Sequence, residues 1–433
     1  MNPLYRNDTL GQHAPSVYAA STPIPPERPK FQGHTSADVV VIGAGFTGLW
    51  AALTLARAGR RVVVLEAHRV GFGASGRNGG QVHSGFNKSQ LWLEKNLGQS
   101  RAQALWALSE GAKTQLRDFC DTHAPEAFFK AGIAHGEYKP SDLDHARAEA
   151  HHLAERYGHT SRILEREAFA EIVKSPLYSG GSLDPSGGHL QPLAYALALA
   201  REAEAAGAII FERSEVTDLQ MGSRLRLMTR GGSISAGHAI VAGNGYLPDI
   251  LPQVNARVLP INSFIAATEP LEDRWTDILA EDIAVADSKF VVNYYRFNEQ
   301  KRFLFGGRES YSIGYPKDIS TALIARMERL FPQLKGVRVD HVWGGSLGIT
   351  VTRLPHLARV APNVLSGSGF SGHGVALSGM AGRVMAEAIL GQDDGFASLE
   401  ALPVPQFPGG NALRGPMLTL AMTWFALRDR LGV

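Results

Sequence analysis

Two short apolar runs near the start of the chain flank a helical pattern. Residues 39–42 are uninterrupted aliphatic side chains, and residues 62–65 repeat this pattern. Each run is too short for a helix, and the lack of polar positions is typical of a strand buried on both faces of a sheet. Between the runs, apolar residues recur at i, i+3, i+4 and i+7 from Leu49 to Ala56. The pattern therefore predicts a strand–helix–strand unit of an α/β sheet.

Three glycines, Gly43, Gly45 and Gly48, connect the first strand to the helix with the spacing Gly-x-Gly-x-x-Gly. The first allows a tight turn, the second lets a pyrophosphate approach the backbone, and the third lets the helix pack closely on the strand. The free amides and the dipole at the helix N-terminus favour a diphosphate. Glu66 ends the second strand, close to where an acid binds ribose hydroxyls and repels a 2′-phosphate. The unit predicts bound FAD or NAD rather than NADP.

A second glycine-rich loop, residues 71–81, follows Glu66 closely. Small residues let the backbone approach a flat ligand, and the loop offers polar contacts from Ser75, Arg77, Asn78 and Gln81. The alternative is a flexible surface loop. The position of the loop, directly after the predicted ribose-binding acid, favours a role in cofactor binding.

Two later segments lead from an apolar strand into glycine. Residues 239–242 run into Gly243, which suggests backbone packed against the cofactor. The glycine-rich segment 365–376 opens into a helix that is predicted over 377–390. Amides at the positive end of a helix dipole suit an oxygen that gains negative charge, such as the pyrimidine oxygen of a reduced flavin. The alternative is a plain structural turn.

The middle of the chain has a different pattern. Residues 88–175 are mostly helical in pattern around a short strand near 132–138, and residues 180–190 predict a turn-rich return to the first domain. A long alanine-rich helix is predicted after Pro192. Three strands are then predicted over 258–268, 290–297 and 302–307. They interrupt the α/β pattern and indicate an inserted α+β domain with an antiparallel sheet.

Composition and charge narrow the function classes. The 433 residues have room for two large domains, and a net charge of +2 without a concentrated basic stripe argues against nucleic-acid binding. Cys120 is the only cysteine, which excludes an internal disulfide and a multi-cysteine metal site. The histidines at 145, 151, 152 and 159 stand among acids and arginines, which favours a solvated helix face over zinc. We predict no metal.

The two ends of the chain carry few signals. Residues 1–35 are proline-rich and predict an extended arm that is either laid over the body or partly mobile. Neither a secretory signal nor a run of about 18 apolar residues is present, so we expect a cytoplasmic protein. The apolar stretch 417–427 favours a helix docked on the body over one on a membrane.

With these stretches in view, the chain resembles the FAD-dependent D-amino-acid oxidase and sarcosine/glycine oxidase superfamily, and within it the bacterial enzymes that oxidise γ-glutamylputrescine. The resemblance covers nearly the whole chain. It rests on six separate motifs, at residues 73–81, 186–189, 241–244, 331–336, 372–375 and 427–433.

The resemblance implies an α/β FAD-binding domain (Rossmann-like, glutathione-reductase-type) with an inserted α+β antiparallel-sheet substrate domain. The expected boundaries are an arm at 1–35, the FAD-binding domain at 36–90, 180–250 and 340–395, the substrate domain at 91–179 and 251–339, and an extension at 396–433.

Residue by residue, the resemblance implies a non-covalent FAD site. The pyrophosphate is expected at Gly43, Ala44, Gly45, Phe46, Thr47 and Gly48, and the adenosine at Glu66, Ala67 and Val216. The flavin is expected at Ser75, Arg77, Asn78, Gly79, Gln81, Gly243, Gly372, His373, Gly374, Val375 and Ala376.

Three departures from the family pattern are informative. Ile349 stands where sarcosine oxidases carry the cysteine that binds FAD covalently, so that link is impossible. Ala376 stands where they carry a lysine for the substrate carboxylate, which favours an amine without an adjacent carboxylate. The lysine that assists oxygen falls near Leu304, which leaves Lys301, Arg302 and Arg308 as nearby cations.

The implied reaction is oxidation of γ-glutamylputrescine or a related polyamine to an imine, hydrolysed to an aldehyde and ammonia, while oxygen becomes hydrogen peroxide. The expected partners are thus a small amine and oxygen. Candidate residues of the reaction pocket are His83, Tyr294, Tyr295, Arg308 and His373. The alternatives are an amino-acid or secondary-amine oxidase of pipecolate type, a dehydrogenase that reduces quinone, and a flavin-binding module without catalysis.

Overall fold

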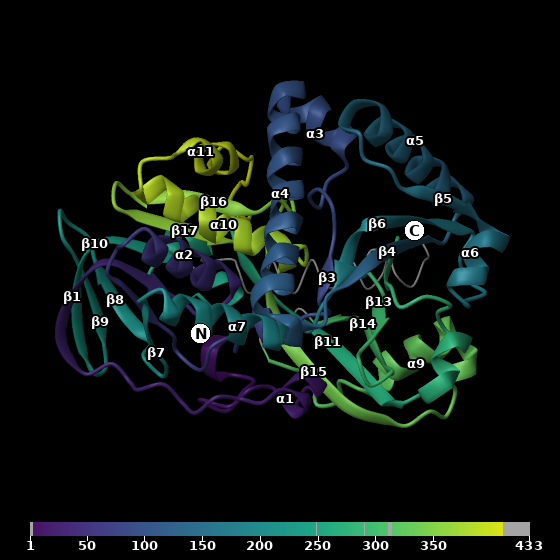
Figure 1. Ribbon diagram of the computed structural model, residues 1–433, viewed down its shortest axis with the longest axis horizontal. Coiled ribbons are helices and arrows are strands. Elements are labelled where there is room, and N and C mark those ends of the chain that lie inside the picture. Colours follow the sequence, from purple (N-terminus) through teal and green to yellow (C-terminus); the bar gives the residue numbers. More distant parts are fainter. Residues whose placement is uncertain (1–2, 248, 290, 311–313, 410–433) are drawn as a thin grey trace.

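The chain folds around two β-sheets that lie side by side (Figure 1). The computed structural model describes residues 3–247, 249–289, 291–310 and 314–409. The strands of the first sheet, drawn at the left of Figure 1, are β1 (Gly33–Ile42), β2 (Val62–Leu65), β7 (Ile209–Phe211), β8 (Val216–Gln220), β9 (Leu225–Thr229), β10 (Gly232–Val241), β16 (His356–Ala361) and β17 (Val364–Ser368).

The second sheet crosses the right-hand half of the molecule. Its strands are β3 (Gln81–Val82), β4 (Lys130–Glu137), β5 (Arg162–Glu165), β6 (Gly180–His189), β11 (Leu259–Pro270), β12 (Ala284–Asp287), β13 (Tyr294–Phe297), β14 (Arg302–Ser310) and β15 (Val339–Ile349). The α-helices are α1 (Val17–Ser21), α2 (Phe46–Arg57), α3 (Gln90–Leu97), α4 (Gln99–His123), α5 (Pro140–Tyr157), α6 (Arg166–Ile172), α7 (Pro192–Ala205), α8 (Pro252–Asn255), α9 (Thr321–Leu330), α10 (Gly374–Ile389) and α11 (Asp394–Glu400).

The first sheet has a parallel centre in the order β17-β10-β1-β2-β7, which confirms the predicted α/β unit. Successive β1 side chains point to opposite faces. Val39 and Val41 pack in the core that contains α2, α7 and α10, whereas Val40 and Ile42 pack in the core that contains β8 and β9. Because both faces are covered, the apolar run has no polar position.

Helix α2 begins immediately after the glycine turn and packs against α7 and α10. A Cβ on Gly48 would lie 1.9 Å from the carbonyl oxygen of Gly43, and one on Gly382 would lie 2.0 Å from that of Thr47. Both glycines are therefore required by backbone contacts within the layer of helices.

The second sheet is mainly antiparallel, with β12 and β4 paired in parallel. The segment 180–190 was wrongly expected to be a turn-rich return, because it forms strand β6 between β4 and β3. Its glycines serve close packing. A Cβ on Gly181 would lie 2.3 Å from the Phe169 ring, and one on Gly188 would lie 2.3 Å from the Lys130 carbonyl oxygen.

Strand β13 also begins later than predicted, at Tyr294, and Phe290 lies outside the described residues. The Asp287 carboxylate accepts the backbone N–H groups of Lys289 and Asn293, which closes a turn before the strand.

By sheet membership, residues 81–82, 180–189 and 339–349 belong to the second sheet. The domain boundaries given above remain a prediction.

The N-terminal arm lies along the body and is anchored at several points. Leu4 and Tyr18 are buried, and the Asp8 carboxylate lies 2.9 Å from the Arg77 guanidinium.

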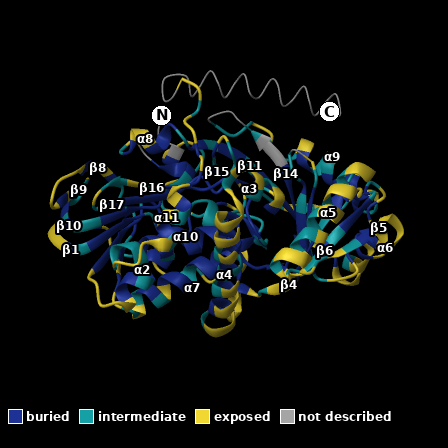
Figure 2. Cartoon of the chain, turned by 90° about the horizontal axis from the view of Figure 1, so that it is seen from above, coloured by how far each residue is buried: buried dark blue, intermediate teal, exposed yellow. Residues whose placement is uncertain are grey.

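Figure 2 shows the burial of both sheets and the exposed side of α4. Among the described helices, none combines the length and the apolar composition needed to cross a membrane. Residues 417–427 lie outside the described part of the chain.

We predict that Gly382→Ala lowers the free energy of unfolding by about 1–3 kcal/mol, because the new methyl group would overlap the Thr47 carbonyl. Urea unfolding monitored by circular dichroism measures this change. Gly111→Ala in helix α4 is the matched control, because a Cβ there meets nothing within 4 Å. We expect this control to raise stability by about 0.5–1 kcal/mol. Equal effects of the two substitutions would contradict the proposed α2–α10 contact.

Candidate active site

The turn from β1 into α2 forms one wall of a narrow cavity. Gly43 has φ +101°, a conformation that favours glycine, and no side chain caps the start of α2 at Gly45. A Cβ on Gly45 would lie 2.7 Å from Ser75 Oγ, which accepts the N–H of Phe46 at 3.0 Å. The predicted glycine-rich loop therefore packs directly on the predicted turn, where Ser75 occupies one N–H of α2, and the helix N-terminus faces the cavity.

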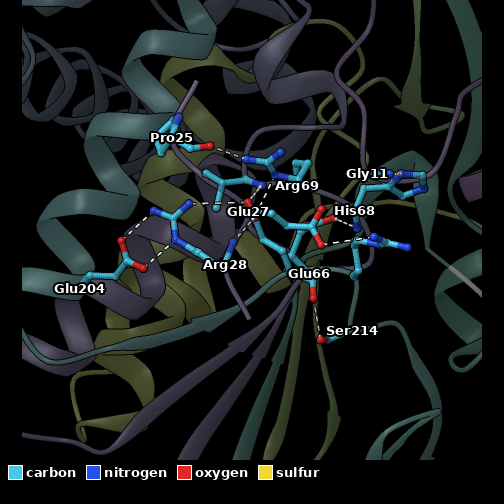
Figure 3. Close-up of polar contacts among 12 residues, drawn as sticks. Gly11, Pro25, Glu27, Arg28, Glu66, His68, Arg69, Glu204 and Ser214 are labelled. Atoms are coloured by element: carbon cyan, nitrogen blue, oxygen red, sulfur yellow. Dashed lines mark hydrogen bonds and ion pairs between the residues drawn. The ribbon is translucent and has the colours of Figure 1, made fainter. Parts of the chain in front are cut away.

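Glu66 is buried at the end of β2, with 8% of its surface exposed. Its carboxylate accepts the N–H groups of Ala44 at 2.7 Å and His68 at 2.8 Å, as Figure 3 shows in part. Burial raises the pKa of Glu66 to about 7, although the two N–H groups oppose that shift. The carboxyl is held rigidly on the cavity wall, as the ribose-binding role requires.

A buried ion cluster supports the segment after Glu66. Arg28 and Arg69 both bind the Glu212 carboxylate, which also accepts the N–H of Val70 at 2.8 Å. Arg28 continues to Glu204 on α7, at 2.6 Å. Figure 3 shows Arg28 between Arg69 and Glu204. The cluster joins the N-terminal arm to the loop after β2, to helix α7 and to the end of β7, and sequence reasoning did not find it.

The narrow cavity has a volume of about 140 Å³ and runs along the β1–α2 turn. The predicted cofactor residues that line it are Gly43, Gly45, Phe46, Thr47, Glu66, Ala67, Ser75, Asn78, Val216, Gly243, Gly372, Gly374 and Val375. Ala44 is fully buried behind the wall, with its N–H bound to Glu66. Gly48 serves the packing of α2 described above.

A larger cavity of about 670 Å³ adjoins the narrow one and shares with it Ala74, Asn78, Leu347, Ser371, Gly372 and Val375. The predicted residues that line the larger cavity are Arg77, Asn78, Gly79, Gln81, His83, Tyr294, Gly372, His373 and Val375. Segments far apart in the sequence therefore meet around one space. Its size suits a flat ring system with a small molecule beside it.

His83 and His373 lie together on the wall of the larger cavity, with ring centroids 5.2 Å apart. Burial lowers the pKa of both, to about 4 for His373 and well below the ordinary value for His83. Both imidazoles are therefore neutral at pH 7. Among the described residues, no hydrogen-bond partner meets the buried Nε2 of His373.

Tyr294 and Tyr295 point to opposite faces of β13. Tyr294 lines the larger cavity, and its hydroxyl lies 3.2 Å from Ser263 Oγ. Tyr295 was wrongly expected in the pocket, because it is buried in the core of the second sheet and donates a hydrogen bond to Tyr178. Adjacent strand residues alternate between faces, and the sequence alone did not reveal which face is the cavity side.

Arg77 and Ala376 differ from their expected roles. The Arg77 guanidinium donates to Asp8 and to the carbonyl oxygens of Phe72 and Gly344, so it mainly holds protein segments together beside the cavity. Ala376 is buried in the core around α10 and lines neither cavity.

The cations expected near Leu304 also lie elsewhere. Lys301 pairs with Asp282 at 3.0 Å, and Arg302 pairs with Asp340, and neither lines a cavity. The expectation that these two cations lie near the reaction pocket is wrong, because each side chain is paired with an acidic residue away from both cavities. The side chain of Arg308 lies outside the described residues.

Several wall residues were missed by sequence reasoning, notably Arg353, Asn87 and His135. Arg353 has φ +62°, and Asn87 donates to the carbonyl oxygen of Ser371 at 2.9 Å. Each depends on a loop or strand that approaches from a distant segment, and no local spacing signals this. In the described part of the chain, no group of three or more His, Cys, Asp and Glu residues is arranged to hold a metal ion.

Comparisons with known proteins agree with this geometry. The family described as FAD dependent oxidoreductase matches residues 38–388. A probable oxidoreductase, OrdL, of Rhizobium meliloti is 38% identical over 96% of this chain and 97% of its own length. The gamma-glutamylputrescine oxidoreductase of Escherichia coli is 35% identical over 98% of this chain and 100% of its own length.

Solved structures show the same fold. The glycine oxidase from Geobacillus kaustophilus superposes with a TM-score of 0.68 at 20% identity, over 82% of this chain and 95% of its own. The L-proline dehydrogenase from P. horikoshii gives a TM-score of 0.68 at 21% identity, over 84% of this chain and 94% of its own. The predicted arrangement, a Rossmann-like domain with a second sheet, is confirmed.

We predict that Glu66→Gln weakens FAD binding by roughly tenfold to a hundredfold. The amide of Gln has only one acceptor oxygen, whereas the two backbone N–H groups and the ribose need both oxygens of a carboxylate. Titration of the apoprotein with FAD, followed by the quenching of flavin fluorescence, measures the Kd. The ionised acid accepts the ribose hydroxyls, so in the wild type the affinity rises as the pH rises through about 7.

Glu167→Gln on the exposed surface of α6 is the control and leaves the Kd unchanged. A Glu66→Gln protein that binds FAD as tightly as the wild type at all pH values would contradict the assigned role of Glu66.

Proposed function

This chain belongs to the FAD-dependent oxidoreductase family, and we propose that it oxidises the primary amine of γ-glutamylputrescine or of a related polyamine. The similarity to gamma-glutamylputrescine oxidoreductase over almost the full length of both chains carries the proposal. The chain is an FAD-dependent amine oxidoreductase. We propose that the chemistry is shared with the family, and that residues of this chain determine which amine it binds.

The described residues fit FAD. The start of α2 on the cavity wall, the backbone of Gly43 and Gly45 beside it, and the buried Glu66 suit an adenosine diphosphate. We propose that the ring system lies in the larger cavity, beside Gly79, Gln81 and Gly372. We also propose that FAD is bound without a covalent link, because Ile349 lines that cavity and Cys120 is buried on α4.

When bound, FAD accepts a hydride from the carbon that bears the amine. The amine thereby becomes an imine, and water converts the imine to an aldehyde and ammonia. Oxygen takes the two electrons with two protons to give hydrogen peroxide. The remaining task of the chain is to bind the amine as the free base and to keep it beside the ring.

The cavity favours the free base over the ammonium form. Apolar residues such as Ile261 and Ile265 line it, and the nearby His83 and His373 are neutral. Removal of water disfavours the charged form of an amine, so proton loss accompanies entry into the cavity. A neutral imidazole can accept a hydrogen bond from the amine N–H. We propose this positioning role for His373, whose Nε2 has no partner among the described residues.

An α-amino acid fits the site less well. Ala376 replaces the carboxylate-binding lysine of the sarcosine-type relatives and lies in the core. The quinone alternative rested on residues 417–427, which lie outside the described part of the chain. We propose oxygen as the electron acceptor, and the peroxide assay described next tests this choice.

We predict that anaerobic mixing of the yellow holoenzyme with γ-glutamylputrescine bleaches the flavin absorbance within one turnover, and that air restores it with one peroxide per aldehyde. Stopped-flow spectroscopy and a peroxide assay measure the two steps. Sarcosine and pipecolate are the comparison substrates. Bleaching by these amino acids alone would favour an amino-acid oxidase, and recovery in air without peroxide would exclude oxygen as the direct acceptor.

We predict a rising limb in the pH dependence of flavin reduction at low substrate concentration. The limb follows deprotonation of the substrate amine, whose ordinary pKa is about 10, and no inflection falls near 6.5, because the pKa values of His83 and His373 are lowered. Stopped-flow traces of the FAD-saturated enzyme between about pH 6 and pH 10 measure this profile. A second limb near 6.5 that disappears in His373→Asn would show that this histidine titrates during the reaction.

A further inference from the structure

A polar cavity of about 620 Å³ adjoins the proposed substrate cavity. His83, His135 and His373 line both spaces, so the cavities meet at these three rings. A molecule whose amine lies beside the ring system can therefore extend past the histidines into the polar cavity. The partnerless Nε2 of His373 at this junction indicates that a ligand group belongs there.

One face of helix α5 lines the polar cavity. Asp142, His145 and Glu149 stand at i, i+3 and i+7 on α5, and Ala146 and Ala150 lie between them on the same face. The sequence predicts a solvated helix face for this region. The structure adds that this face lines a cavity, whose wall also includes residues of β4 and β6.

The acids around the cavity are only partly neutralised. Glu137 on β4 pairs with His135 at 2.8 Å, and Asp184 on β6 pairs with His159 at 3.4 Å. Within the described ranges, Asp142 and Glu149 form no ion pair with a basic side chain. Asp142 accepts a hydrogen bond from Ser288 at 3.4 Å, and Glu149 accepts the N–H of Gln90. Asp142 thus presents a carboxylate to the cavity, and the second oxygen of Glu149, buried on the same helix face, has no hydrogen-bond partner among the described residues.

His135 offers the complementary charge. Its side chain keeps 42% of its surface accessible and lines both cavities. The Glu137 carboxylate binds Nδ1 and raises the pKa of His135, despite the opposing effect of burial. Nδ1–H donates to Glu137, and in the protonated ring the Nε2–H is left as a donor for an anion. The wall therefore presents acids and a histidine donor around one space.

We infer that the polar cavity binds the zwitterionic amino-acid head of the substrate, with its ammonium at Asp142 and Glu149 and its carboxylate at His135. This inference rests on the proposed function, because it places the end of the substrate remote from the oxidised amine. It also separates a γ-glutamyl amine from free putrescine, which has an ammonium but no carboxylate. Polar groups left unpaired in a cavity discriminate strongly against a ligand that lacks the matching group.

Three amides of putrescine test the inference, each with the same reactive amine. The γ-glutamyl amide carries both charges of the head, the 4-aminobutanoyl amide lacks the carboxylate, and the glutaryl amide lacks the ammonium. Calorimetric titration of the dithionite-reduced, FAD-saturated enzyme under anaerobic conditions gives their Kd values, because the reduced flavin cannot take a hydride from the amine. We expect the γ-glutamyl amide to bind at least tenfold more tightly than either of the others.

Two variants separate the charges. Asp142→Asn with Glu149→Gln should weaken the γ-glutamyl and aminobutanoyl amides by roughly tenfold or more, and the glutaryl amide by much less. His135→Gln should instead weaken the γ-glutamyl and glutaryl amides by roughly tenfold or more, and the aminobutanoyl amide by much less. Asp144→Asn is the matched control, because Asp144 is exposed on the same helix and does not line the cavity.

The outcomes distinguish this inference from the proposed function. Equal binding of the three amides by the wild type would overturn the inference even if each amide bleaches the flavin. Equal weakening of all three amides by the Asp142 and Glu149 substitutions would also overturn it, because general attraction of cations or altered folding would then explain the loss. Selective binding without any bleaching would support the head site and refute the amine oxidation.

Discussion

The architecture depends on backbone segments that approach one another without intervening side chains. The β1–α2 turn is closed by the contact of Gly48 with Gly43, and α10 lies on α2 because Gly382 has no side chain opposite Thr47. These contacts hold the start of α2 and the start of α10 on the same cavity wall. Two positive helix ends thereby meet one elongated space, and no charged side chain is needed at the predicted diphosphate position.

The glycine-rich loop after Glu66 carries the chain from the first sheet into the second. Ser75 contacts the α2 turn, whereas Gln81 begins β3 and donates to the Val285 carbonyl in the second sheet. The buried Arg296 fixes the loop between these points, because it donates to the carbonyl oxygens of Gly79 at 2.6 Å and Leu190 at 2.8 Å. The larger cavity lies where the sheets meet, so the cofactor domain supplies one wall and the second sheet supplies the other.

The residues predicted for the nucleotide lie mostly on the wall of one cavity, and the sequence can identify them because their determinants are local. The strand, the glycine spacing and Glu66 occur within one continuous segment, and their physical roles follow from that spacing. The reaction pocket is different. Whether Tyr294 or Tyr295 faces the cavity depends on the register of β13, and the glycines of β6 predict a turn until their neighbours across the sheet are known.

Long-range partners explain the other differences. Arg77 is a residue type that often contacts ligands, but its guanidinium is paired with Asp8 of the N-terminal arm. The acids of α5 have the spacing of an exposed helix face, and only the packing of β4 and β6 nearby makes that face the wall of a cavity. Buried charge pairing and cavity shape arise from segments distant in sequence, so no single stretch of the chain encodes them.

A crystal structure of the holoenzyme with γ-glutamylputrescine, kept anaerobic, tests the central claim most directly. The account predicts the FAD ring system between the loop at Gly79 and the start of α10, with the substrate amine on the His83 and His373 side. An adenosine bound away from Glu66, or a substrate bound outside the cavity shared by the two sheets, would contradict it.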